Sequence, residues 1–170
     1  MRKQHWVAAA LAVLGLGAAM PVMAATLPAR TPGLWQSTTT VTGPDGKPVA
    51  NAVNVVTVSC VDPATDLKFF TSGGSACASL TIAGSGAKYT IDGSCTQQGK
   101  PVRIDETLTY SGAQHVTLQA KLGAESGPVT VSSILQWQGA CPAGMMPGDE
   151  GSMSGGGFSK ADNINDPVNQ

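Results

Sequence analysis

The sequence predicts an all-β domain formed by one curved antiparallel meander of about seven strands, approaching a half-barrel or a barrel. Charged residues make up only 12% of the 170-residue chain, whereas Gly, Thr, Ser and Val are plentiful. This mixture suits strands joined by tight turns, because β-branched side chains fit a pleated surface and Gly weakens helices. Strand-like runs also alternate with turn motifs from Gly33 onward. A two-sheet β-sandwich is the alternative arrangement.

Residues 1–24 are predicted to be a signal peptide. Arg2 and Lys3 give a positively charged start, an apolar run extends from Val7 to Ala19, and a cleavage motif ends at Ala24. The apolar run is shorter than the roughly 20 residues that cross a bilayer. We therefore expect a bacterial protein that is exported to the periplasm, cleaved after Ala24, and without a membrane span in its mature part.

Composition also limits the expected partners and the domain count. The formal net charge of the whole chain is −1, and cleavage removes two cations and no acids. Nucleic acid is therefore not an expected partner, because its binding needs a basic surface. We expect a single all-β domain over residues 25–149. A flexible tail over residues 150–170 should follow, because that segment has almost no apolar pattern.

Turn motifs divide the domain into seven predicted strands and one short helix. Gly43-Pro44-Asp45-Gly46 is a turn, with Pro and Gly where turn geometry favours them. Asp62 followed by Pro63 is typical of a helix N-cap and first turn, so a short helix is expected over Pro63–Phe70. The predicted strands are Gly33–Val41, Val49–Ser59, Ala76–Ala83, Ala87–Ser94, Val102–Tyr110, His115–Leu122 and Pro128–Gln138.

The clearest strand is His115–Leu122. Its apolar residues, Val116, Leu118, Ala120 and Leu122, alternate with polar ones, which indicates one apolar and one solvent-facing side. A large sheet with one apolar face must bury that face. Curling of the sheet on itself is the expected solution.

The cysteines are predicted to form two disulfides, because an even count behind a signal peptide is typical of a disulfide framework. Three pairings are possible for the four residues. We favour Cys77–Cys95, since the segment between them has the pattern of a hairpin. Cys60–Cys141 then follows by elimination.

This pairing raises two geometric questions. The apolar pattern sets Leu80 near Ile91, one residue out of register with the favoured disulfide, so either a bulge absorbs the difference or the pairing is wrong. In a strict seven-strand meander, Cys141 would also lie at the opposite end from Cys60. Either a strand is missing from the count, or a connection crosses over, or the sheet stays open and the tail folds back.

Glu106 is the most interesting ionisable candidate. On the strand ending at Tyr110 it shares a face with apolar residues, where burial would raise the pKa of its carboxyl and mark a binding cavity. A bulge at Asp105-Glu106 that turns the side chain outward is the favoured alternative. Tyr110 is a further candidate for lining such a cavity.

Trp35 and Trp137 are expected to plug the core or one end of a barrel, and a pocket-lining role is the minority interpretation. No catalytic residue, metal site or cofactor is predicted. His115 is the sole histidine of the mature part, falls on the polar side of its strand, and has no G-x-S-x-G nucleophile motif to serve. The methionines at 145, 146 and 153 are of a type that binds Cu(I), but a flexible exposed tail is the favoured interpretation.

These features together resemble a known exported family. Pro32-Gly33-Leu34-Trp35 opens the first strand, the four cysteines follow, and Gly144-Met145-Met146-Pro147-Gly148-Asp149 comes after the last of them. Over roughly Pro32 to Cys141 the chain resembles the bacterial family known as domain of unknown function 3617. That resemblance implies a periplasmic β-rich protein and carries over no activity. Gly33-Leu34-Trp35 also resembles the G-x-W opening of lipocalin barrels, where an Arg near the last strand covers the Trp; here no Arg follows Arg103.

The predicted function is that of a non-enzymatic binding domain for a small apolar ligand or a cell-envelope partner. The basis is a curved sheet with one apolar face, two Trp and no catalytic constellation. The alternative is a structural or interaction protein that uses the edge strands of an unclosed sheet. A third hypothesis is an enzyme that uses Glu106.

Overall fold

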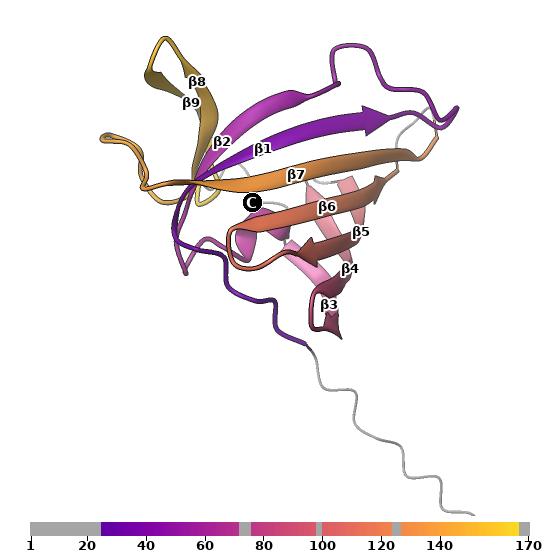
Figure 1. Cartoon of the computed structure of the whole chain (residues 1–170). Coiled ribbons are helices and arrows are strands. Elements are labelled where there is room, and N and C mark those ends of the chain that lie inside the picture. The colour runs from indigo at the N-terminus through magenta and orange to yellow at the C-terminus, as the bar shows by residue number, and fades with distance from the viewer. Residues whose placement is uncertain (1–24, 72–75, 98–99, 124–126, 167–170) are drawn as a thin grey trace, which may run out of the picture.

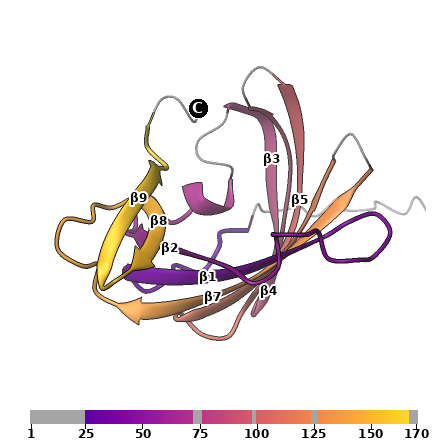
Figure 2. The same cartoon turned by 90° about the horizontal axis from the view of Figure 1, so that it is seen from above.

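A computed structural model describes residues 25–71, 76–97, 100–123 and 127–166 of the chain. The predicted signal peptide, residues 1–24, lies outside the described residues. The described chain forms nine antiparallel strands in one open, strongly curved sheet (Figures 1 and 2). The elements are β1 (Gly33–Thr42), β2 (Val55–Val61), the 3₁₀ turn η1 (Lys68–Phe70), β3 (Ala76–Ser85), β4 (Lys88–Gln97), β5 (Lys100–Tyr110), β6 (His115–Leu122), β7 (Val129–Gly139), β8 (Asp149–Ser154) and β9 (Gly157–Asn163).

Two connections break the simple meander. The strand order is β3-β4-β5-β6-β7-β1-β2-β8-β9, so the β1–β2 hairpin sits between β7 and β8. The chain crosses from β2 to the far edge to begin β3, and after β7 it passes the hairpin to add β8 and β9 beside β2. The two edges of the sheet are therefore β3 and β9.

The curved all-β sheet is confirmed, and the seven predicted strands correspond to β1–β7. The sandwich alternative is wrong, because all the described strands belong to one sheet. The expected flexible tail is wrong as far as residue 163, because the chain from Asp149 to Asn163 forms the β8–β9 hairpin. This hairpin has a polar sequence, and it is placed by pairing of β8 with the free edge of β2.

Asp149 organises the start of that hairpin. Its carboxylate accepts hydrogen bonds from the Met146 N–H at 2.8 Å and from the Asn163 amide at 2.7 Å, and it forms an ion pair with Lys160 at 2.8 Å. Burial alone would raise the pKa of Asp149, but these partners hold it below its ordinary value. A buried carboxylate with three partners thus fixes a segment that has no apolar pattern.

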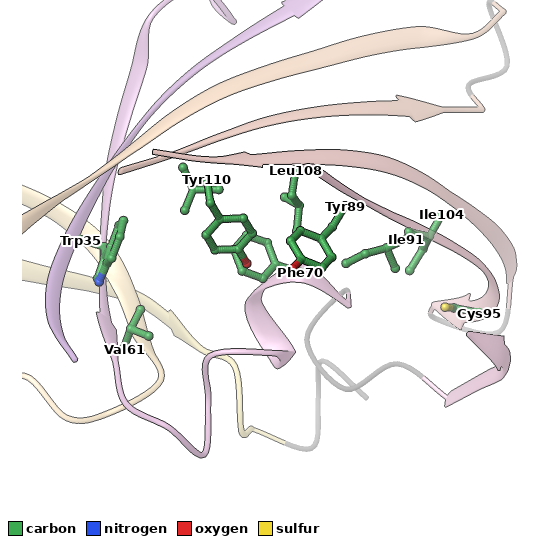
Figure 3. Close-up of a cluster of buried hydrophobic side chains, with 10 residues drawn as sticks. Trp35, Val61, Phe70, Tyr89, Ile91, Cys95, Ile104, Leu108 and Tyr110 are labelled. Carbon is green, nitrogen blue, oxygen red and sulfur yellow. The ribbon is translucent and has the colours of Figure 1, made fainter. Parts of the chain in front are cut away.

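The predicted helix over Pro63–Phe70 is shorter than expected, and only its last three residues form η1. The predicted N-cap is wrong for η1, whose N-cap position is Leu67 without a side-chain cap. The Asp62 carboxylate instead holds the turn before η1, where it accepts the Thr65 N–H at 2.8 Å and the Thr65 hydroxyl at 2.7 Å. The hydrogen bond from the Thr65 hydroxyl is the main cause that lowers the pKa of Asp62. The turn matters because it carries Phe70, which is 2% exposed, into the core cluster (Figure 3).

The main core lies on the concave face. Figure 3 shows Phe70 of η1 among inward-facing side chains of the strands. Tyr89 and Tyr110 meet edge to face there, with ring centres 5.8 Å apart. The buried members of this cluster are Trp35, Val61, Phe70, Tyr89, Ile91, Cys95, Ile104, Leu108, Tyr110 and Val116.

Both disulfides are present, Cys77–Cys95 and Cys60–Cys141. The crossovers explain how Cys60 and Cys141 come to lie at the same end of the sheet. β2 and β7 flank β1 and both run antiparallel to it, so both strands end on the same side. A register shift after Cys77 supplies the required bulge. This register shift goes in the opposite direction from the one that the apolar pattern predicts. Leu80 pairs with Gly93, whereas the apolar pattern sets Leu80 near Ile91.

Candidate functional site

The four candidate residues do not line one common cavity. Glu106 lies between Ile91 and Ala120 on the neighbouring strands, and both of these are buried. The favoured bulge is wrong, because the pairing of β5 with β4 runs without a shift through this position. One carboxyl oxygen of Glu106 is buried and has no hydrogen-bond partner among the described residues. Burial raises the pKa of Glu106 to about 7.

The two tryptophans anchor the segment that enters β1. Trp35 is 1% exposed, and its indole N–H donates to the Thr31 carbonyl at 2.8 Å. Trp137 pairs with it on β7 and donates its indole N–H to the Pro32 carbonyl at 3.1 Å. Gly33 has a φ of +134°, and an added Cβ would collide with the Gly139 carbonyl. The Gly-Leu-Trp motif is therefore explained by close strand packing.

Tyr110 is buried and its hydroxyl has no hydrogen-bond partner in the described part of the chain. The pKa of the Tyr110 phenol is raised mainly by burial, so the phenol is neutral at physiological pH. Tyr110 lines an open hollow of about 380 Å³ together with Pro28 and Ala113. That hollow contains none of the other three candidates.

A different cavity, of about 240 Å³, lies on the concave face beside η1. Its polar wall consists of hydroxyls from β1, β2 and β7: Ser37, Thr39, Thr57, Ser59 and Ser133. Its apolar wall consists of Phe69, Phe70, Leu118 and Leu135. Strands of the sheet form one side of the cavity and η1 forms another, so the cavity is bounded by separate elements of the fold.

The hydroxyl wall is partly preorganised. The Thr39 and Ser133 hydroxyls lie 2.8 Å apart across the β1–β7 pair, and the Ser37 and Thr39 hydroxyls lie 3.2 Å apart along β1. Each hydroxyl can donate one hydrogen bond and accept two. These linked hydroxyls can therefore still form hydrogen bonds with a group in the cavity.

Charged groups mark one end of the cavity. Arg30 is buried, and its Nε donates to the Asp66 carboxylate at 2.6 Å. The Arg30 guanidinium carbon also lies 4.9 Å from the Trp35 ring centre and 4.4 Å from that of Phe70. Burial lowers the pKa of Arg30 and Asp66 opposes this, so the guanidinium remains charged. Glu150 of β8 also lines the cavity and is close enough to Arg30 for the two charges to interact.

Sequence reasoning missed both Arg30 and Glu150. Glu150 was assigned to the flexible tail, whereas it pairs with Ser59 at the edge of β2. An arginine does cover Trp35, but it precedes the motif instead of following the last strands. The one available signal was that Arg30 stands beside an otherwise uncharged stretch that leads into Trp35.

A larger hollow, of about 490 Å³, lies over the outer face of the same sheet. Its outward-facing residues include Thr38, Thr40, Thr107, Thr109 and Thr117. No aromatic side chain is among the residues that line it. The concave cavity combines apolar and polar walls, and it is therefore the better candidate site.

Metal-binding residues do not gather in the described ranges: no three His, Cys, Asp or Glu side chains lie close enough to hold an ion. The methionines are also separated. Met145 is buried in a small cluster with Val58 and Cys60, which corrects its placement in a flexible tail, whereas Met146 is 67% exposed.

Taken together, the fold and the cavity define an open, single-sheet all-β domain with two disulfides. The chain belongs to the family described as protein of unknown function (DUF3617), which it matches over residues 30–141. That match ends before the β8–β9 hairpin. No curated protein and no solved structure matches the chain significantly. Among the described residues, no helix has the length and apolar character needed to cross a membrane.

Proposed function

We propose that this protein is a non-enzymatic binding domain of the bacterial periplasm, which holds a small, largely apolar ligand on the concave face of its sheet. The observation that carries the proposal is the cavity beside η1. On the same face, β4, β5 and β6 carry apolar side chains that close the core, whereas β1, β2 and β7 carry hydroxyls around an open space.

A purely structural domain would gain from filling this space. Burying one large aliphatic side chain contributes about 1.5–3 kcal/mol, and the hydroxyl positions forgo that gain. Ligand pockets typically combine apolar walls with a few directed polar groups. The cavity, with two Phe, two Leu and a hydroxyl chain, has this composition.

The periplasmic location is supported by two observations. Residues 1–24 have the sequence pattern of a secretory leader. The mature part has two disulfides, which form and persist in oxidising compartments.

Native mass spectrometry of protein expressed with its leader and purified from the periplasm tests the proposal. We expect cleavage after Ala24, two disulfides and a retained small molecule. Ser133→Leu should abolish retention, because the larger side chain fills the cavity. Ser132→Leu, on the other face of β7, is the matched control and should retain the molecule. A wild-type spectrum without any adduct, or equal retention by both variants, would contradict the proposal.

A second candidate function is strand addition at β3. This edge strand carries no charged residue, and Leu80 on it is 38% exposed. The opposite edge, β9, carries Lys160 and Asp162, which are of the type that protects edges. The Ala25 N–H already donates to the Ile82 carbonyl, so part of the β3 edge is covered. Concentration-dependent self-association in sedimentation, abolished by Leu80→Lys, is the expected result; a monomeric wild type argues against pairing between copies.

A further inference from the structure

We propose that the ligand of the concave cavity carries a cationic amine at one end, held by the Glu150 carboxylate, and an apolar body against η1. This inference rests on the binding function proposed above and adds the chemical class of the ligand. It follows from the contrast between the two charged residues that line the cavity.

Glu150 is the charged group with free capacity. Its carboxyl lines the cavity and is half-buried, and no side-chain hydrogen bond to it occurs among the described residues. Burial, then the nearby Asp162, raises the pKa of Glu150, while Arg30 opposes the shift. A desolvated carboxylate gains a charge-assisted hydrogen bond when an ammonium group enters beside it. A ligand amine would therefore offset the cost of desolvating this carboxylate.

Arg30 is not free to hold an anion. Its Nε and its backbone N–H both donate to the Asp66 carboxylate, at 2.6 and 2.9 Å. The faces of the guanidinium are covered by the rings of Trp35 and Phe70. Because Arg30 and Asp66 neutralise each other, the charge that Glu150 brings to the cavity is negative. An anionic ligand would be repelled there.

The rest of the cavity fits an apolar body. Phe69, Phe70 and Leu118 provide the apolar surface, and the hydroxyl wall offers hydrogen bonds without a net charge. A short alkyl chain ending in an ammonium group uses both parts of the cavity. An alcohol of the same length uses the apolar part and lacks the charge.

Isothermal titration of the oxidised, processed protein with n-hexylamine, n-hexanol and n-hexanoate tests the inference. We expect the amine to bind about tenfold more tightly than the alcohol, as one charge-assisted hydrogen bond allows, and the acid to bind most weakly. Glu150→Gln should bring the amine to within about twofold of the alcohol, while alcohol binding stays unchanged. Glu106→Gln is the matched control, because it changes a half-buried glutamate outside the cavity and should preserve the preference.

The outcomes separate this inference from the function on which it rests. Equal binding of the three probes, or tighter binding of the acid, overturns the amine assignment and leaves a binding cavity in place. A preference for the amine that survives Glu150→Gln overturns the role of Glu150. Absence of binding by every probe overturns the inference together with the proposed function.

Discussion

Replacing Glu106 with Gln changes how the folding stability depends on pH. In the folded chain the pKa of Glu106 is raised from the ordinary 4.5 to about 7, because its carboxyl is buried between Ile91 and Ala120. The unfolded chain loses this proton near pH 4.5 and the folded chain near pH 7. Folding therefore becomes less favourable as pH rises through that window, and the loss is complete above it.

The magnitude follows from the size of the shift. Moving the carboxyl pKa from 4.5 to about 7 corresponds to a loss of about 3 kcal/mol at alkaline pH. Gln has nearly the same shape and no charge to lose. We expect Glu106→Gln to be more stable than the wild type by up to about 3 kcal/mol at about pH 8, and within about 0.5 kcal/mol of it at about pH 4.

Urea unfolding of the oxidised protein, followed by tryptophan fluorescence at several pH values, measures this difference. Asp105→Asn is the control, since it changes the adjacent acid on the opposite face of β5 and should not reproduce the pH-dependent gain. If the wild type and Glu106→Gln differ by the same amount at every pH, the carboxyl is not desolvated in the folded chain and the reasoning is refuted.

Three further changes test other parts of the structure, each by urea unfolding at neutral pH. Asp66→Asn should cost about 3 kcal/mol because it leaves the buried Arg30 charge without its partner; a cost below about 1 kcal/mol would contradict the buried ion pair. Gly33→Ala should lower the free energy of unfolding by more than about 2 kcal/mol, because backbone strain adds to the collision of the new Cβ with its neighbours. Gly46→Ala has the backbone strain without the collision and should lower it by about 1 kcal/mol. Deleting residues 150–170 should lower the unfolding midpoint, because β8 covers the edge of β2; an unchanged midpoint would mean that the hairpin is not part of the cooperative unit.

Much of the fold could be predicted because strand patterns are local. β6 has the predicted bounds, His115–Leu122, since its alternation of apolar and polar residues has the period of a strand. The β8–β9 hairpin could not be predicted in this way. Its order depends on the edge of β2 and on the partners of Asp149, which the chain brings together only after folding. The direction of the β3–β4 bulge likewise escaped a pattern argument, because beyond the disulfide the ladder pairs Leu80 with Gly93 and Ile82 with Ile91.

The site was less predictable than the fold. Glu106 could be singled out because it shares a strand face with apolar residues. The favoured prediction of a bulge that turns its side chain outward was wrong. The cavity could not be found, because it depends on which hydroxyls of β1 and β7 face η1. Thr39 and Ser133 lie 94 residues apart in sequence and meet only through the crossover topology. Arg30 and Glu150 line the same cavity and interact there, although they come from opposite ends of the domain's sequence.

Nuclear magnetic resonance mapping of n-hexanol on the ¹⁵N-labelled, processed protein tests the central claim most directly. The cavity predicts saturable shift changes confined to the residues that line it, among them Ser37, Thr39, Thr57, Ser133, Phe69 and Phe70. Ser133→Leu should remove these changes and Ser132→Leu should keep them. Shift changes gathered on the outer threonine face, or no saturable change at all, would contradict a ligand site on the concave face.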